Sequence, residues 1–191
     1  MGIELPSRFK HTIISNGIRS ACLENPLKVA FKHGDKTRTY RELIQRMDSI
    51  AEIISSSDIP LKSNIAIVAS NSIEYMEIVL ASSQLGHPIA TINPKLTATE
   101  LVSICEDSEA KLLFVDEKAH SLLKGIEIKG IKRIIDIDNQ MEGLIGQTDC
   151  QEEFPTVTET DTFTIPYTSG TTGKPKGVLV PHRSRALTLY G

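Results

Sequence analysis

The residues best suited to chemistry lie near the end of the sequence, in the stretch YTSGTTGKPKGVLVPHR (167–183), between two apolar segments typical of strands. The loop in this stretch combines small residues, hydroxyl donors and positive charge, and it has no carboxylate. Its glycines are Gly170, Gly173 and Gly177, its hydroxyl residues are Thr168, Ser169, Thr171 and Thr172, and its lysines are Lys174 and Lys176. Glycines let backbone N–H groups approach a ligand closely. Amide and hydroxyl donors with lysines are suited to hold a polyphosphate, whereas a metal site would need carboxylates, histidines or thiolates.

Two better-known phosphate motifs do not fit this loop. A Walker loop has four residues between its glycines and runs directly into a helix. Here two residues separate Gly170 from Gly173, Pro175 follows Lys174, and a strand pattern comes next. The dinucleotide fingerprint G-x-G-x-x-G is also absent. A solvated Gly/Ser/Thr linker is the structural alternative, but linkers seldom lie between two apolar strands and carry paired lysines.

The charge distribution supports an anion site at the loop. Residues 162–191 contain no acidic side chain, and their basic residues are Lys174, Lys176, Arg183 and Arg185. The rest of the chain is acidic, and the whole chain has a net charge of −3. A local positive field favours anion binding, although chance clustering over so short a segment would give the same composition. The net negative charge argues against general nucleic-acid binding.

Alternating strands and helices precede the loop and must position it. Apolar runs rich in β-branched residues predict strands at residues 64–70, 87–92, 111–116 and 132–137. Helices are expected before and between them from the capping patterns Thr39-x-x-Glu42, Asn71-x-x-Glu74 and Thr97-x-x-Glu100. This alternation predicts an α/β fold with a mainly parallel sheet flanked by helices on both faces. Its expected core includes Leu43, Met47, Val68, Leu80 and Leu113.

The sequence divides into three parts. Residues 1–137 form the expected α/β subdomain, which begins with two short strands within residues 28–40 and a helix over residues 40–55. Residues 138–161 form an acidic connection with seven acidic residues, no basic residue and short helical turns. Residues 162–191 are expected to form a strand (162–168), the phosphate loop and a second strand (177–182). A helical pattern then starts without room to finish, which indicates a chain cut from something longer.

The loop sequence TSGTTGKPKG resembles the phosphate-loop signature of the adenylate-forming (AMP-binding) enzymes. These are the acyl- and aryl-CoA synthetases, the adenylation domains of peptide synthetases and firefly luciferase. TYREL (39–43) and LGHPIATINPKLTATEL (85–101) are similar to two further segments of that family, and the Asn93-Pro94 form favours the fatty-acid and other acyl-CoA synthetases. The resemblance implies the N-terminal subdomain of the adenylate-forming fold, truncated after the phosphate loop, with the rest of the large domain and the C-terminal domain absent.

The resemblance also implies a reaction. A carboxylic acid attacks the α-phosphate of ATP with Mg²⁺, pyrophosphate leaves, and the acyl-adenylate then passes its acyl group to the thiol of coenzyme A. By position, the residues that would bind the ATP phosphates are Thr168, Ser169, Gly170, Thr171, Thr172 and Gly173. Lys176 would neutralise the departing pyrophosphate, whereas Lys174 falls on a variable position and would only screen charge. No catalytic residue and no metal ligand is assigned within the 191 residues, and this chain alone is expected to be inactive.

Several alternatives stay open. His182 follows the second strand where the family has a histidine, and it fits a place near the substrate or a hydrogen-bonded structural role equally well. The chain could instead belong to a peptide-synthetase adenylation domain, a non-catalytic nucleotide-binding domain or a degenerate truncated homologue. The other histidines, expected at the surface or in turns, are His11, His33, His87 and His120.

The remaining expectations concern environment and partners. No apolar run approaches the ~18 residues of a membrane span, and the N-terminus lacks the apolar region of a secretory signal. The few, widely separated cysteines, Cys22, Cys105 and Cys150, suit reduced thiols and a cytoplasmic location. The expected partners are a small carboxylic acid, ATP and coenzyme A. The sequence leaves the formation of an oligomer open.

Overall fold

The computed structural model describes residues 13–148, 154–168 and 175–188. Its centre is a sheet in the order β6-β5-β3-β4-β7-β8, with β9 also paired to β7. The bounds of these strands are β3 Ile65–Val68, β4 Ile89–Ile92, β5 Leu112–Val115, β6 Arg133–Asp136, β7 Thr162–Thr168, β8 Lys176–Gly177 and β9 Val180–Pro181. Strands β3 to β7 pair in parallel, whereas β8 and β9 run antiparallel to β7. The predicted mainly parallel sheet is confirmed.

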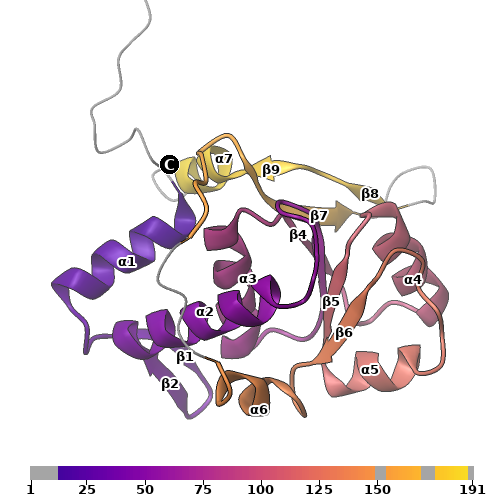
Figure 1. Ribbon diagram of the computed structural model, residues 1–191, viewed down its shortest axis with the longest axis horizontal. Coiled ribbons are helices and arrows are strands. Elements are labelled where there is room, and N and C mark those ends of the chain that lie inside the picture. The colour runs from indigo at the N-terminus through magenta and orange to yellow at the C-terminus, as the bar shows by residue number, and fades with distance from the viewer. Residues whose placement is uncertain (1–12, 149–153, 169–174, 189–191) are drawn as a thin grey trace, which may run out of the picture.

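Helices cover both faces of this sheet (Figure 1). One face carries α1 (Ile14–Glu24), α2 (Tyr40–Ser55), α3 (Ile73–Leu85) and the short α6 (Met141–Ile145), and the other carries α4 (Ala98–Asp107) and α5 (Glu117–Leu123). A hairpin of β1 (Val29–His33) and β2 (Lys36–Thr39) precedes α2, and α7 (His182–Leu187) follows β9. Two apolar clusters, one on each face, contain alternate residues of the same strands, such as Ile67 and Val68 on β3. Full burial of both faces explains why the strands read as continuous apolar runs.

The local signals of the sequence are mostly confirmed. The expected core residues Leu43, Met47, Val68, Leu80 and Leu113 are all buried. Thr39 and Thr97 each form a complete capping box with the glutamate three residues later, at the start of α2 and α4. Gly86 ends α3 in a left-handed conformation (φ 71°), which glycine adopts without strain.

The predicted cap of α3 was wrong by one residue. The Ser72 side chain, not that of Asn71, accepts the hydrogen bond from the Tyr75 N–H at the start of this helix. Both residue types cap helices well, so the sequence pattern alone could not separate them. The shift leaves Asn71 free of the capping role and at the mouth of a cavity that lies at the end of β3.

The expected single strand over residues 177–182 was also wrong, because the structure divides it into β8 and β9. The antiparallel register with β7 is continuous from Tyr167↔Gly177 to Thr164↔Val180. Opposite the gap lies Pro166, whose carbonyl accepts from the Val178 N–H (3.0 Å) but which has no N–H to donate in return. Missing donors interrupt ladders, so the proline in β7 accounts for the break in its partner.

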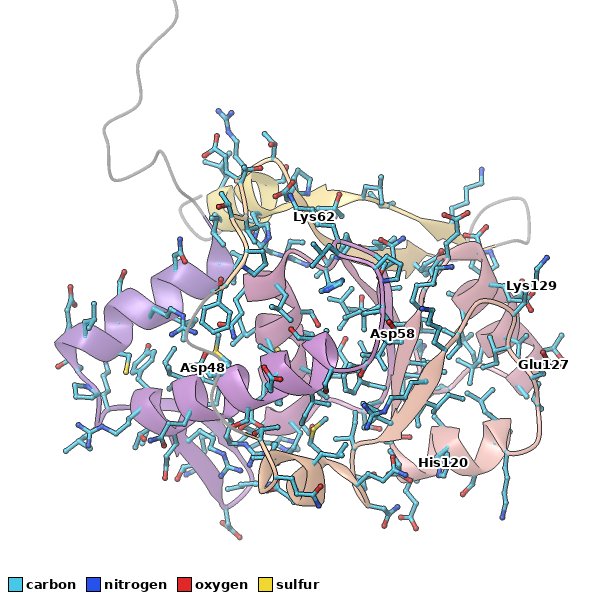
Figure 2. The ribbon with its side chains drawn as sticks, in the orientation of Figure 1. Asp48, Asp58, Lys62, His120, Glu127 and Lys129 are labelled. Atoms are coloured by element: carbon cyan, nitrogen blue, oxygen red, sulfur yellow. The ribbon has the colours of Figure 1, made fainter. Side chains whose placement is uncertain are left out.

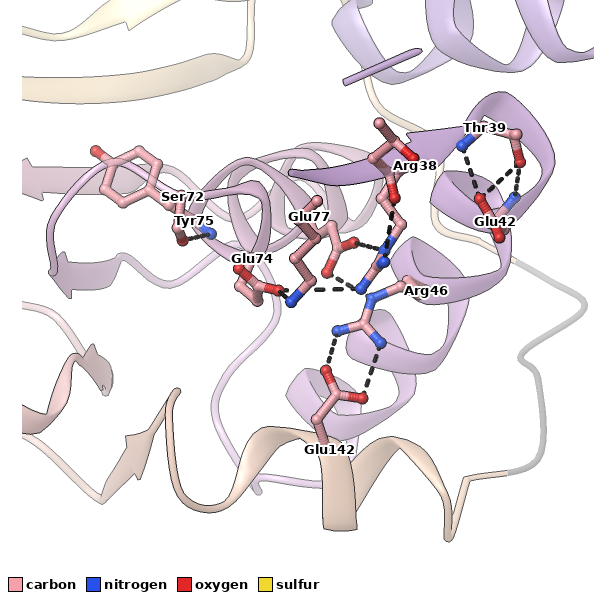
Figure 3. A network of polar contacts seen from close by, with 11 residues as sticks. Arg38, Thr39, Glu42, Arg46, Ser72, Glu74, Tyr75, Glu77 and Glu142 are labelled. Atoms are coloured by element: carbon pink, nitrogen blue, oxygen red, sulfur yellow. Dashed lines mark hydrogen bonds and ion pairs between the residues drawn. The ribbon is translucent and has the colours of Figure 1, made fainter. Parts of the chain in front are cut away.

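A cluster of charged side chains joins α2, α3, β2 and α6 beneath the hairpin (Figure 3). Glu77 of α3 is fully buried and accepts hydrogen bonds from Arg38 Nε (3.1 Å) and Arg46 Nε (2.6 Å). Arg46 also donates to both carboxylate oxygens of Glu142, at 3.0 and 2.7 Å, and this contact lowers the pKa of the Glu142 carboxyl. The cluster therefore attaches the first helix of the acidic connection to the helical layer.

The end of the acidic connection is attached at a different point. Lys62, labelled in Figure 2, donates to the Asp161 carboxylate at 3.0 Å, just before β7 begins. The expected short helical turn in the connection is present as α6. Ion pairs thus attach the acidic connection near both of its ends. Through this connection the chain passes from β6, at one edge of the parallel strands, to β7, at the other edge.

Candidate functional site

The phosphate loop leaves the sheet at its carboxyl edge. Strand β7 lies parallel to β4 with Thr91 opposite Pro166, and the loop follows the last residue of β7. In open α/β sheets, ligands bind outside the carboxyl ends of the parallel strands. Residues Ser169 to Lys174 lie outside the described part of the chain. Of the loop, the structure therefore describes only the base. That base is the antiparallel pair of β7 with β8, in which Thr168 faces Lys176.

Lys176 lies at the base of the loop, in strand β8. It is exposed, and no hydrogen bond or ion pair of its side chain occurs among the described residues. Its place in β8, directly opposite the last residue before the loop, fixes where its flexible stem starts. The structure thus brings Lys176 and the backbone of Thr168 together. Lys174 and the remaining predicted phosphate ligands lie outside the described residues.

A cavity of about 400 Å³ lies at the same edge, between the ends of β3 and β4. Its polar lining includes Asn71, Tyr75, Asn93 and Lys95. Because β4 and β7 run in parallel register, Asn93 comes level with Thr168, which places this cavity beside the base of the loop. Sequence reasoning missed the cavity as a unit. The available signal was a polar group directly after each of two apolar strands, at residues 70–71 and 93–95.

A smaller cavity of about 240 Å³ lies between the ends of β3 and β5. Its two aspartates are already held by backbone donors. Asp116 accepts from the Ser70 N–H (2.9 Å), and Asp138 accepts from the Glu117 N–H (2.8 Å). These carboxylates therefore order the turns at the strand ends.

His182 lies at the opposite end of β7 from the phosphate loop. Its backbone N–H donates to the Asp161 carbonyl (3.1 Å), and β7 then spans roughly 20 Å to Thr168. The ring is fully buried, lies 5.2 Å from the Phe163 ring between centroids, and its Nδ1 accepts from the Ile14 N–H at 3.4 Å. Burial lowers the pKa of this imidazole to about 4. Of the two roles that the sequence left open, these contacts favour the structural one.

The other histidines differ from one another. His87 is buried rather than exposed, although it does lie in the turn before β4, where its Nδ1 donates to the Ser63 carbonyl at 2.7 Å. His33 is exposed, His120 on α5 lies half-exposed beside Asp136 (Figure 2), and His11 lies outside the described residues. The signal missed for His87 was its position between Gly86 and an apolar strand, where the backbone turns into the core.

The described residues also bear on cofactors and membranes. Within the described ranges, no three histidine, cysteine or acidic side chains gather closely enough to hold a metal ion. No helix of that same part of the chain is long and apolar enough to cross a bilayer. Burial raises the pKa of the Cys105 thiol to about 12, so this side chain behaves as a small apolar core residue.

The fold is an α/β sheet in which strand β7 leads, through a loop rich in glycine, hydroxyl and lysine residues, to the antiparallel strand β8. Residues 18–191 match the family described as AMP-binding enzyme. The chain therefore belongs to the AMP-binding enzyme family.

Relatives of two kinds resemble the chain. Malpibaldin synthetase of Mortierella alpina is 32% identical over 91% of this chain and 3% of its own length. The medium-chain-fatty-acid–CoA ligase of Ectopseudomonas oleovorans is 30% identical over 81% of this chain and 31% of its own length. The chain thus spans less than a third of either protein.

Solved structures share the fold at lower sequence identity. The anthranilate CoA ligase AuaEII in complex with anthranoyl-AMP matches with a TM-score of 0.88 and 20% identity, over 97% of this chain and 36% of that one. The N-terminal domain of FACL13 from Mycobacterium tuberculosis matches with a TM-score of 0.82 and 23% identity, over 91% of this chain and 44% of that one. The fold expected from the resemblance, the N-terminal subdomain of the adenylate-forming enzymes, is confirmed.

Proposed function

We propose that the protein is an ATP-dependent carboxylic acid–CoA ligase and that this chain supplies its phosphate-binding part. In the proposed reaction, the acid carboxylate attacks the α-phosphorus of ATP, the bond to the β-phosphate oxygen breaks, and pyrophosphate leaves. The thiol of coenzyme A then takes the acyl group from the adenylate and releases AMP. The observation that carries the proposal is the phosphate loop at the carboxyl edge of the sheet, with exposed Lys176 at its base.

The chain's own residues would act on the phosphates. Residues 168–173 would bind the β- and γ-phosphates through amide and hydroxyl donors, and Lys176 would offset the negative charge that develops on pyrophosphate as it leaves. A donor placed in advance where charge develops lowers the barrier without reorganisation. Lys174 would contribute only screening. Mg²⁺ would accompany ATP, but the described residues offer it no cluster of ligands, so we assign it no step here.

A second candidate is an adenylation domain of a peptide synthetase. The similarity to malpibaldin synthetase supports it, as does a 28% identity to tyrocidine synthase 2 of Brevibacillus parabrevis over 84% of this chain. Both candidates make an adenylate and differ in the acceptor of the acyl group. Asn93-Pro94, the form that favours CoA synthetases, is the reason to prefer CoA over a carrier protein. Formation of acyl-CoA in a reaction supplied with CoA would identify the CoA ligase. An adenylate that does not pass its acyl group to CoA would favour the peptide-synthetase domain.

The experiment is acid-dependent exchange of labelled pyrophosphate into ATP by the protein as its gene encodes it, across a panel of fatty and aryl acids. Lys176→Ala should lower the exchange rate about ten- to a hundredfold, because a charge-assisted hydrogen bond contributes roughly 1.5–3 kcal/mol. Lys174→Ala should cost less, and Lys32→Ala, at an exposed lysine in the hairpin, should cost nothing. Melting temperatures should be unchanged in all three. Full exchange by Lys176→Ala would contradict the role given to this lysine.

The same assay tests what the 191 residues can do alone. We expect no acid-dependent exchange from them, because they span only 31% of the length of the medium-chain-fatty-acid–CoA ligase that they resemble. The folded state of the isolated chain is checked by a cooperative melting transition. Exchange by the chain alone would contradict this expectation.

A further inference from the structure

A tyrosine directly before the phosphate loop connects the base of the loop to a helix on the face of the sheet. The Tyr167 hydroxyl donates a hydrogen bond to Asp107 Oδ2 at 2.7 Å, across 60 positions of sequence. Asp107 is the last residue of α4. Burial, and then the hydrogen bond with Asp107, raises the pKa of the Tyr167 phenol, so it remains a donor. Near the base of the loop, this contact joins strand β7 to α4, an element outside the sheet.

The returning strand is built around the same ring. Gly177 pairs with Tyr167 across β7 and β8, and a Cβ at position 177 would lie 2.9 Å from Tyr167 Cζ and 3.1 Å from its hydroxyl oxygen. It would also lie 2.9 Å from Ile165 Cγ2. Contacts this short require one side to move, so only glycine leaves room for the ring beneath β8. Lys176 directly precedes Gly177, so it lies next to the point where β8 packs against the Tyr167 ring.

Asp107 is not explained by the stability of its own helix. A carboxylate in the last turn of a helix interacts unfavourably with the helix dipole, and α4 has no basic residue there to compensate. The side chain is exposed at the helix end, and the tyrosine hydroxyl is its hydrogen-bond partner. The carboxylate of Asp107 is therefore better explained by its hydrogen bond to Tyr167 than by a contribution to the stability of α4.

We propose that Tyr167 is a positioning residue for the phosphate loop and that Asp107 is its anchor. The hydrogen bond of the Tyr167 hydroxyl fixes its ring, and the ring packs against Gly177 of β8. The position of β8 in turn fixes the backbone of Lys176. This inference rests on the proposed function, because it assigns Lys176 an ATP phosphate as its target. Without the anchor, the pair of β7 and β8 can still form, but the base of the loop samples positions that place Lys176 away from the pyrophosphate.

The test uses pyrophosphate exchange by the protein as its gene encodes it, with KM and kcat measured separately for ATP and for the best acid. Tyr167→Phe, which removes one oxygen atom, should lower kcat/KM for ATP about ten- to a hundredfold, the range expected for loss of a hydrogen bond to a charged group. The KM for the acid should stay within about twofold. Asp107→Ala should lower kcat/KM for ATP as much as Tyr167→Phe does. Asp107→Asn keeps an acceptor oxygen, so its kcat/KM should stay within about threefold of the wild type. Tyr40→Phe, at the start of α2, is the matched control.

Double-variant behaviour separates anchoring from general weakening of the fold. If both groups act through one hydrogen bond, Tyr167→Phe combined with Asp107→Ala should be no worse than either change alone. Additive losses would overturn the inference, and so would a Tyr167→Phe enzyme within about twofold of the wild type for ATP. Equal losses for ATP and acid with a lowered melting temperature would also overturn it. Absence of exchange in the wild type would overturn the proposed function itself, which keeps the two failures distinguishable.

Discussion

Acidification should destabilise the protein through His182. The ring is fully buried, and its pKa is lowered by burial from an ordinary value of 6.5 to about 4. Its Nδ1 accepts a hydrogen bond from the Ile14 N–H, so the neutral ring carries its proton on Nε2. Protonation would place a charge in the core and turn the acceptor into a second donor, which would break the contact that holds the start of α1.

The size of the effect follows from linkage. Since the folded pKa lies below the unfolded value, the unfolded chain binds the proton first as the pH falls. The stability from the neutral ring is fully present above pH 6.5 and is lost as the pH falls from 6.5 to about 4. At about 1.4 kcal/mol per pKa unit, the loss approaches about 3 kcal/mol in full and reaches about 2 kcal/mol between pH 7 and pH 4.5.

The assay is urea unfolding at intervals between pH 7 and pH 4.5, followed by circular dichroism, for the wild type and His182→Asn. Asparagine can offer an acceptor to the Ile14 N–H but cannot take a proton, so the difference between the two proteins isolates this ring from carboxylates that titrate in the same range. The free energy of unfolding should fall by about 2 kcal/mol more in the wild type than in the variant. His33→Asn, at an exposed position, is the matched substitution control. Parallel pH profiles for the wild type and His182→Asn would refute the reasoning.

Two further predictions concern the charged cluster and the loop base. Glu77→Ala should destabilise the fold by about 3–5 kcal/mol in urea unfolding, because it removes the fully buried carboxylate that two partly buried arginines share. Glu142→Ala, which removes a mostly exposed partner, should cost no more than about 1 kcal/mol, and equal costs would contradict this account of the cluster. Gly177→Ala should lower exchange activity more than it lowers the melting temperature, because its Cβ would displace the Tyr167 ring. Unchanged activity would show that the ring tolerates the extra atom.

Local signals were sufficient wherever a short stretch of chain decides its own structure. The capping boxes of Thr39 and Thr97 each satisfy their helix start within four residues, and the glycine at position 86 supplies the left-handed turn that ends α3. The β-branched runs indicated strands buried on both faces, and the alternation with helices indicated parallel pairing. The residue types of the proposed phosphate loop could also be recognised from the sequence, since they lie within a single segment.

Contacts between distant segments could be decided only by the tertiary structure. Nothing in the sequence near Tyr167 indicates that Asp107 will accept a hydrogen bond from its hydroxyl, or that Gly177 must be small because that ring packs against it. The burial of His182, and its separation from the loop by the length of β7, depend on how β9 returns along that strand. The sequence by itself determined most of the helices and strands, because those follow from neighbouring residues. Pairing register and packing decided which side chains meet, because each such contact joins residues whose separation along the chain carries no local signal.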